Sequence, residues 1–474
     1  VRPMRLNIRC SLILRVSRQN EKADDTACES RYRVRMNMRK RGNMWLRRSV
    51  LAGALVVFLA AGVSACGTGR VSGSGTESEQ NAADARKAAA EAGNTDQDAG
   101  KSGNGSGGEL QQDGSGQSGR AVSAPVWSNM KPERSMELSY AKQFSVDYYD
   151  GGYDLIQVQD DSTYLVVPEE AAVPEGLPAS ITVLQKPLDH VYLAATSAMD
   201  LIAALNRTDR ITLSGTKESG WYVEAAKEAM EEGSLTYAGK YSAPDYEQIV
   251  SSGCDLALES TMIYHVPDVK AQLEQLKIPV FVERSSYEAH PLGRMEWIRL
   301  YGVLFDEEEK AEQLFKEQME QLDAVLANQS TGKSAAFFYI TTNGAVNVRK
   351  PGDYVAKMIE LAGGSYVPQT ADADENALST MNMQMETFYA EAKDADCLIY
   401  NSTIDGELQT LDELLQKSPL LVDFKAVKNG NVWCTGKNMF QETMGLGNMI
   451  LDLHTVFAEE EPADGELHYL HRLQ

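Results

Sequence analysis

Residues 237–258 read YAGKYSAPDYEQIVSSGCDLAL, a glycine-containing turn, a helix and a short strand in direct succession. Pro244, Asp245 and Glu247 supply the proline and the acidic residues that favour the first turn of a helix. The apolar run that begins after Asp255 is typical of a buried strand. Strands that alternate with helices in this way predict an α/β fold with a mostly parallel sheet.

The same alternation extends outward on both sides of this stretch. Residues 126–290, to which we assign the β-rich segment 136–183, are predicted to form a first α/β lobe. Residues 328–474 are predicted to form a second lobe. Between them, residues 291–327 have a helical pattern without a strand, so we expect one long helix or a helix pair to bridge the lobes.

The first residues of the chain have the pattern of a secretion signal and are not expected to belong to a folded domain. A basic cluster precedes the apolar run Leu51 to Ala61, which is too short for a comfortable membrane span, and small residues then lead to Cys66. The tetrapeptide VSAC resembles the bacterial lipobox, which implies a lipid on the Cys66 sulfur. We therefore expect residues 1–43 to be upstream sequence, 44–65 a lipoprotein signal peptide, and 66–125 a disordered Gly/Ser-rich tether.

Composition narrows the classes of function. The formal net charge is −23, which argues against nucleic acid as a partner, because nucleic acid selects basic surfaces. Cys254, Cys397 and Cys434 each lie in or beside an apolar run and lack metal-ligand spacing. They are predicted to be buried thiols of the core.

Two stretches resemble one family. Residues 237–258 are similar to a block in bacterial ABC-importer substrate-binding proteins for iron–siderophore, haem and cobalamin, although Gly253-Cys254 replaces the usual Lys-Pro. Residues 290–298, HPLGRMEWI, resemble the family's crossing to its backbone helix. The resemblance implies two α/β lobes bridged by one long rigid helix, with a ligand cleft between them. It also implies a monomer, anchored by lipid at the extracytoplasmic face of the cell membrane, that serves an ABC permease and its ATPase.

The resemblance also suggests docking residues. In the family, one glutamate in each lobe lies at an exposed helix start and pairs with arginines of the permease, as carboxylate–guanidinium pairs do. Glu247 and Glu386 occupy the matching positions of this sequence. The alternative is that both residues only stabilise the positive end of a helix dipole.

Ligand contacts are expected in loops at the carboxyl ends of strands. Tyr241 is the leading candidate, because the cobalamin-binding relative carries an aromatic residue there and because aromatic rings suit a large ligand. Arg294 and Arg349 could neutralise carboxylate, hydroxamate or catecholate oxygens. The remaining candidates are Thr196, Ser197, Thr261, Tyr264, His290 and Trp433.

The leading ligand is a metal chelate, first a ferric siderophore, with haem and cobalamin as runners-up. One alternative is direct binding of zinc or manganese by His265 and His290, which both follow first-lobe strands. Another is a surface adhesin or structural lipoprotein. The sequence has no G-x-S-x-G, H-E-x-x-H or P-loop motif, so we expect neither an enzyme nor a resident cofactor.

Overall fold

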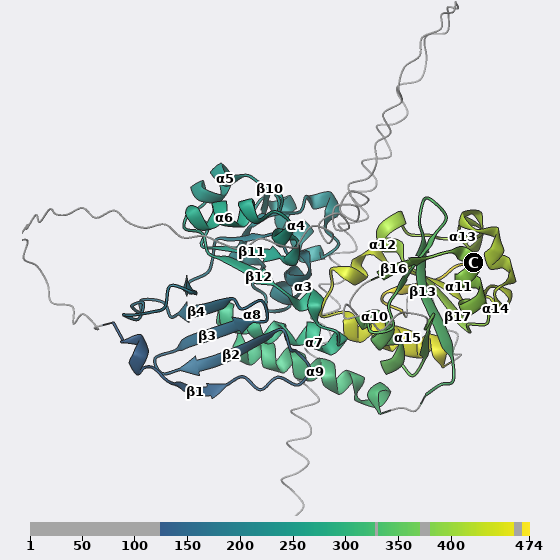
Figure 1. The fold of residues 1–474 in the computed structure, drawn as a ribbon, viewed down its shortest axis with the longest axis horizontal. Coiled ribbons are helices and arrows are strands. Elements are labelled where there is room, and N and C mark those ends of the chain that lie inside the picture. The colour runs from purple at the N-terminus through teal and green to yellow at the C-terminus, as the bar shows by residue number, and fades with distance from the viewer. Residues whose placement is uncertain (1–123, 328–329, 370–379, 459–466) are drawn as a thin grey trace, which may run out of the picture. The chain divides into compact units, whose positions relative to one another are not determined.

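The computed structural model describes residues 124–327, 330–369, 380–458 and 467–474 (Figure 1). The predicted signal peptide, Cys66 and nearly all of the predicted tether lie outside these residues. Within the described ranges, no helix combines the length and the apolar character that a membrane crossing needs.

The described chain begins with a five-stranded sheet in the order β1-β2-β3-β4-β5. The first four strands are antiparallel and the fifth is parallel to the fourth. Their bounds are β1 Pro132–Ser135, β2 Phe144–Tyr149, β3 Tyr153–Val158, β4 Thr163–Val167 and β5 Ile181–Gln185. Phe144, Val146 and Ile156 pack into the main core, whereas Tyr153 and Leu165 pack into a small cluster that is separate from it. The segment 126–186 therefore forms a sheet of its own.

Two buried glutamates hold the connection between β1 and β2. Glu296 accepts hydrogen bonds of 2.7–2.8 Å from the backbone nitrogens of Ser139, Tyr140 and Ala141. Glu288 accepts bonds of 2.8–3.0 Å from the next two nitrogens and a bond of 3.1 Å from the Trp297 indole. Five consecutive amides thus bind to Glu288, which lies just before the short helix Pro291–Glu296, and to Glu296, the last residue of that helix.

The second sheet, in the order β12-β11-β6-β7-β8, is parallel throughout, as the alternation of the sequence predicts. Its strands are β6 Val191–Leu193, β7 Ile211–Ser214, β8 Thr236–Tyr237, β11 Leu256–Ser260 and β12 Val280–Glu283. The helices between them are α3 Thr196–Ala204, α4 Glu224–Glu232, α5 Tyr246–Ser251 and α6 Pro267–Gln275. The small hairpin of β9 Gly239–Lys240 and β10 Ala243–Pro244 precedes α5.

Three helices follow, namely α7 Pro291–Glu296, α8 Ile298–Phe305 and α9 Glu308–Leu326. α9 is the long helix that joins the lobes, because it packs on α8 at one side and on α15 of the second lobe at the other. The chain turns between α8 and α9 at Asp306, which has a left-handed φ of 58°. A Cβ on Gly302 would lie 2.8 Å from that of Ala311, so the glycine lets the two helices approach closely.

The third sheet runs in the order β16-β14-β13-β17-β18-β19, and β15 pairs with the first half of β13. Its strands are β13 Ser334–Ile340, β14 Val346–Arg349, β15 Ser365–Val367, β16 Thr380–Met383, β17 Cys397–Tyr400, β18 Val432–Thr435 and β19 Leu470–Arg472. The helices are α10 Tyr354–Leu361, α11 Met385–Ala392, α12 Ser402–Asp405, α13 Leu411–Lys417, α14 Lys425–Lys428 and α15 Leu446–Phe457. β15, β13, β17 and β18 are parallel, which confirms the expected second α/β lobe.

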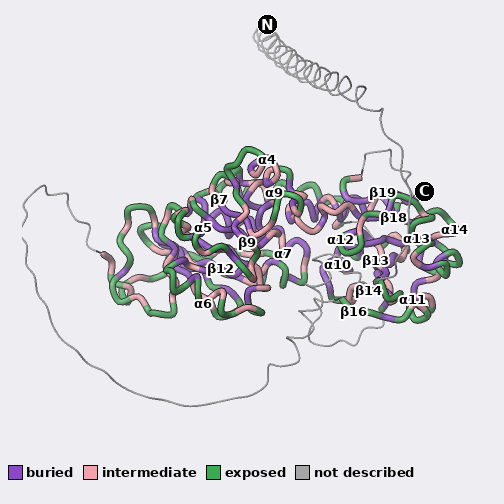
Figure 2. Tube along the Cα trace, turned by 90° about the horizontal axis from the view of Figure 1, so that it is seen from above, coloured by how far each residue is buried: buried purple, intermediate pink, exposed green. Residues whose placement is uncertain are grey.

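One hydrophobic cluster extends through both lobes and includes Leu193, Tyr301, Phe337 and Leu453. The outer helices, α6 and α14 among them, have residues that are exposed to solvent (Figure 2). Cys397 and Cys434 are free and buried, as predicted, and Cys254 is free and half-buried.

Candidate functional site

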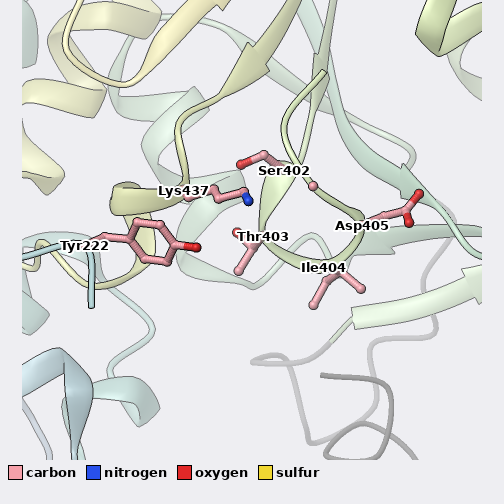
Figure 3. Close-up of a pocket in the computed structure, with 7 residues that line it drawn as sticks. Tyr222, Ser402, Thr403, Ile404, Asp405 and Lys437 are labelled. Carbon is pink, nitrogen blue, oxygen red and sulfur yellow. The ribbon is translucent and has the colours of Figure 1, made fainter. Parts of the chain in front are cut away.

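An open cavity of about 430 Å³ lies where strands of both lobes end (Figure 3). β17 and β18 of the second lobe deliver the chain into α12 and into the short helix η7 (Lys437–Phe440). The first lobe contributes Tyr222 from the loop after β7. The lining residues are Tyr222, Ser402, Thr403, Ile404, Asp405, Gly406 and Lys437. Because α/β proteins bind ligands at the carboxyl ends of their strands, this cavity is the candidate site, and we call it the cleft.

Hydrogen bonds fix the second-lobe wall of the cleft. The Asn401 side chain caps α12 by accepting a bond of 3.1 Å from the Thr403 nitrogen. The Ser402 nitrogen donates to the Thr435 hydroxyl over 3.1 Å, which ties the end of β17 to that of β18. Asp405 forms an ion pair with Lys417 outside the lining. The first two bonds tie α12 to the ends of β17 and β18.

The cleft presents one cation and several hydroxyl groups. The ammonium of Lys437 and the hydroxyl of Tyr222 point into the same space beside Thr403, whereas Asp405 points away (Figure 3). Lys437 is half-buried, and none of the described carboxylates forms an ion pair with it. A half-buried ammonium with hydroxyl donors nearby can bind an anionic group that carries oxygen atoms.

Two of the predicted site residues meet elsewhere at the boundary of the lobes. The Arg294 guanidinium lies 3.5 Å from the centre of the Tyr354 ring, and that of Arg349 lies 5.8 Å from it. Arg294 also donates to the carbonyl oxygens of Ser286 and Glu288, at 2.6 and 3.1 Å. Cation–π contacts thus join α7 to α10 across the boundary, with both guanidiniums already engaged.

Ser197 lies at the same boundary, one residue after Thr196 begins α3. Its hydroxyl donates to a Glu283 oxygen over 3.2 Å, and its carbonyl accepts from the Thr443 hydroxyl at 2.8 Å. Burial raises the pKa of the Glu283 carboxyl. Hydrogen bonds from Ser285 and from the Ser197 hydroxyl partly offset this increase. Ser197 is therefore engaged in contacts within the protein.

The remaining predicted contacts are dispersed. Tyr241 lies in the β9–β10 hairpin, and Thr261 and Tyr264 lie in the short helix η4 (Thr261–His265) after β11. The Tyr264 hydroxyl donates to Asp160. Trp433 is 2% exposed, and its indole donates to the Asn431 side chain over 2.6 Å, so it is a core residue in this structure. None of the predicted contacts lines the cleft of Figure 3.

The two histidines of the metal alternative have separate surroundings. His265 is exposed at the end of η4. His290 caps α7 by accepting a bond of 3.2 Å from the Leu292 nitrogen, and its ring stacks on Tyr140. Burial lowers the pKa of His290, and its Nδ1 is occupied by the bond from Leu292. Among the described residues, one group of three metal-ligating side chains is close enough to share an ion, and it comprises Asp189, His190 and Asp255 at the amino ends of β6 and β11.

The predicted docking residues are both exposed, and each lies in the first turn of its helix. Glu247 follows Asp245, whose side chain caps α5 by accepting from the Gln248 nitrogen at 3.0 Å. Glu386 follows the uncapped start of α11. Both carboxylates are thus accessible to a partner, and docking itself stays a prediction.

Tyr222, Thr403 and Lys437 line the cleft but are not among the residues predicted from the sequence. The expectation that ligand contacts follow strands would have selected the last two. Thr403 lies three residues after the end of β17, and Lys437 lies two residues after that of β18. Tyr222 carries no such signal, because a turn and a short helix separate it from β7.

The chain is similar to several known proteins. The sequence model of the periplasmic binding protein family matches residues 191–439, just over half of the chain. An uncharacterised lipoprotein of Methanocaldococcus jannaschii is 24% identical over 362 residues, which cover 70% of this chain and 84% of that protein. Among solved structures, the petrobactin-binding protein of Bacillus subtilis has a TM-score of 0.49 at 12% identity and covers 65% of this chain and 99% of its own. The periplasmic haem-binding protein of Vibrio cholerae has a TM-score of 0.46 at 17% identity, with 56% and 97% covered.

Proposed function

This chain belongs to the periplasmic binding protein family, and from that membership we propose that it captures a metal chelate outside the cell and delivers it to the permease of an ABC importer. A ferric siderophore is the proposed ligand, with haem and cobalamin as runners-up. The proposal includes a lipid anchor on Cys66 at the membrane, which is supported by the description of the Methanocaldococcus jannaschii relative as a lipoprotein.

The chemistry of the cleft carries the proposal. Lys437 offers a positive charge that no described carboxylate neutralises, and Tyr222 and Thr403 add hydroxyl groups beside it. A ferric catecholate carries negative charge on oxygen atoms, which are the acceptors that such donors bind. The cleft volume of about 430 Å³ is within the range of small-molecule sites, roughly 300–1,000 Å³.

The charge of Lys437 gives a test of ligand class. We expect the protein to bind anionic ferric enterobactin, measured by quenching of Trp and Tyr fluorescence, more tightly than cationic ferrioxamine B. Lys437→Met should weaken binding of ferric enterobactin about 10-fold or more, because a charge-assisted hydrogen bond contributes roughly 1.5–3 kcal/mol.

Lys428→Met is the matched control, because Lys428 is exposed on α14 and pairs with Asp423 away from the cleft. Its affinity should equal that of the wild type. The proposal fails if no ferric siderophore, haem or cobalamin binds while zinc or manganese does. The role of Lys437 fails if Lys437→Met binds ferric enterobactin as tightly as the control.

Anchoring has a test of its own. Cys66→Ala should abolish incorporation of a clickable palmitate analogue in cells and release the protein from the membrane fraction, because one thioether carries the proposed lipid. Cys254→Ala is the control and should leave labelling unchanged. Equal labelling of Cys66→Ala and the wild type would remove the anchor from the proposal.

A further inference from the structure

A short segment before α15, residues 441–444, ties the second lobe to the first. The Gln441 side chain accepts a hydrogen bond of 2.8 Å from the Tyr222 nitrogen and donates one of 2.8 Å to the Gly220 carbonyl. An amide side chain is one of the few groups that can serve a neighbouring donor and acceptor together. These two bonds fix the backbone on either side of Trp221, which is itself buried.

Two further bonds from the same segment reach α3. The Thr443 hydroxyl donates to the Ser197 carbonyl over 2.8 Å, and the Met444 nitrogen donates to the Asp200 carboxylate over 2.7 Å. Glu442, between Gln441 and Thr443, binds within its own lobe and accepts from the Tyr469 hydroxyl at 2.7 Å. The segment is therefore fastened to the second lobe through Glu442 and the backbone of Gln441, and it binds the first lobe through the Gln441 and Thr443 side chains and the Met444 nitrogen.

The segment also connects two residues of the cleft. Tyr222, which receives the Gln441 bond, lines the cleft from the first lobe. Lys437, which lines it from the second lobe, begins the short helix η7 that ends directly before Gln441. We propose that residues 441–444 form an interlobe latch, in which Gln441 is a positioning residue that holds Tyr222 opposite Lys437 before ligand arrives. The effect on ligand rests on the proposed function, whereas the latch itself does not.

The latch has a consequence for affinity. A ligand that contacts both Tyr222 and Lys437 meets them in place and loses less free energy to ordering them. Without the latch, part of the binding free energy is needed to bring the two walls together, so the apparent affinity falls in proportion to the population of the competent state. A ligand that bridges the walls must in turn favour the latched state.

Amide hydrogen exchange tests the latch without ligand. In Gln441→Ala the Tyr222 amide loses its acceptor, and we expect its exchange to accelerate about 10-fold or more relative to the wild type. The Met444 amide should also exchange faster, because its hydrogen bond to Asp200 depends on the same contact between the lobes. Gln384→Ala is the matched control, because Gln384 is exposed at the start of α11 and caps nothing. Unchanged exchange at Tyr222 in Gln441→Ala would overturn the latch.

Chelate binding tests the positioning role separately. Gln441→Ala should weaken ferric enterobactin about 10-fold, with the thermal midpoint close to that of Gln384→Ala. Thr443→Val should act in the same direction, and Thr443→Ser, which keeps the hydroxyl donor, should restore wild-type affinity. Faster exchange with unchanged affinity would overturn the positioning role. If the wild type binds no chelate, the proposed function fails, and the exchange measurement still decides the latch.

Discussion

The carboxylate of Glu296 illustrates how single buried charges hold this fold. Glu296 is fully buried and accepts three backbone hydrogen bonds from residues 139–141. In Glu296→Gln the amide group cannot accept all three, so donors are left unpaired. We expect a loss of roughly 2–3 kcal/mol in the free energy of unfolding, measured by urea denaturation. Glu320→Gln, at an exposed position of α9, should change it by less than about 0.5 kcal/mol.

Glu259 differs from Glu296, because both oxygens of its carboxyl group are buried without a hydrogen-bond partner. Burial raises the pKa of this carboxyl from 4.5 to about 8, so the folded protein keeps a proton that the unfolded chain releases. Stability contributed by this group is therefore present below pH 4.5 and is lost as the pH rises toward 8, by up to roughly 1.4 kcal/mol per pH unit.

Glu259→Gln removes that titration. Urea denaturation across this pH window should show that the free energy of unfolding depends less on pH in the variant than in the wild type. As the pH rises, the variant should become more stable relative to the wild type. Parallel profiles for the two proteins would show that Glu259 is not the group responsible.

At the scale of elements, the β9–β10 hairpin depends on Gly239. The residue has a φ of 83°, and a Cβ there would collide with the Ala243 carbonyl and lie 2.9 Å from the Asp245 nitrogen. Gly239→Ala should therefore combine backbone strain with a clash and lower the unfolding free energy by about 2 kcal/mol or more. Gly233→Ala separates the two effects, because Gly233 has a φ of 79° with open space around it and should cost only about 1 kcal/mol. Equal losses would exclude the clash.

Elements with a strong local pattern were predictable, and those fixed by distant contacts were not. The apolar runs of β11, β12, β13 and β17 give parallel strands because such strands are buried on both faces. For residues 291–327 the pattern left open one long helix or a helix pair, and the turn at Asp306, where α8 packs on α9, separates two helices there. The candidate site was hardest. Tyr222 enters the cleft through a hydrogen bond to Gln441, a residue 219 positions away that no local pattern links to it.

At the scale of the whole molecule, each lobe carries one exposed glutamate, Glu247 or Glu386, that is predicted to dock on the permease. Glu247→Ala combined with Glu386→Ala should leave the affinity for ferric enterobactin unchanged, because neither residue lines the cleft. Uptake of the iron complex by cells should fall sharply, since loss of a desolvated charged partner at an interface costs roughly 2–5 kcal/mol. Glu228→Ala with Glu391→Ala, in the middle of α4 and in the last turn of α11, is the control because neither residue is at a helix start.

Reversal of both charges sharpens the docking test. Lysines at positions 247 and 386 should reduce uptake further than alanines, because like charges would then face the permease arginines. Normal import by the double alanine variant, or loss of chelate binding before loss of import, would leave the helix-dipole explanation in place of docking.

The bonds between residues 139–143 and the two buried glutamates also constrain the order in which the protein assembles. The five amides belong to the connection between β1 and β2 of the first sheet, yet their acceptors come 145 to 157 residues later in the chain. As the polypeptide is synthesised from its amino end, this stretch emerges long before Glu288 and Glu296 and keeps its donors in water meanwhile. The sheet made first is therefore completed late, after the parallel strands that follow it have been synthesised.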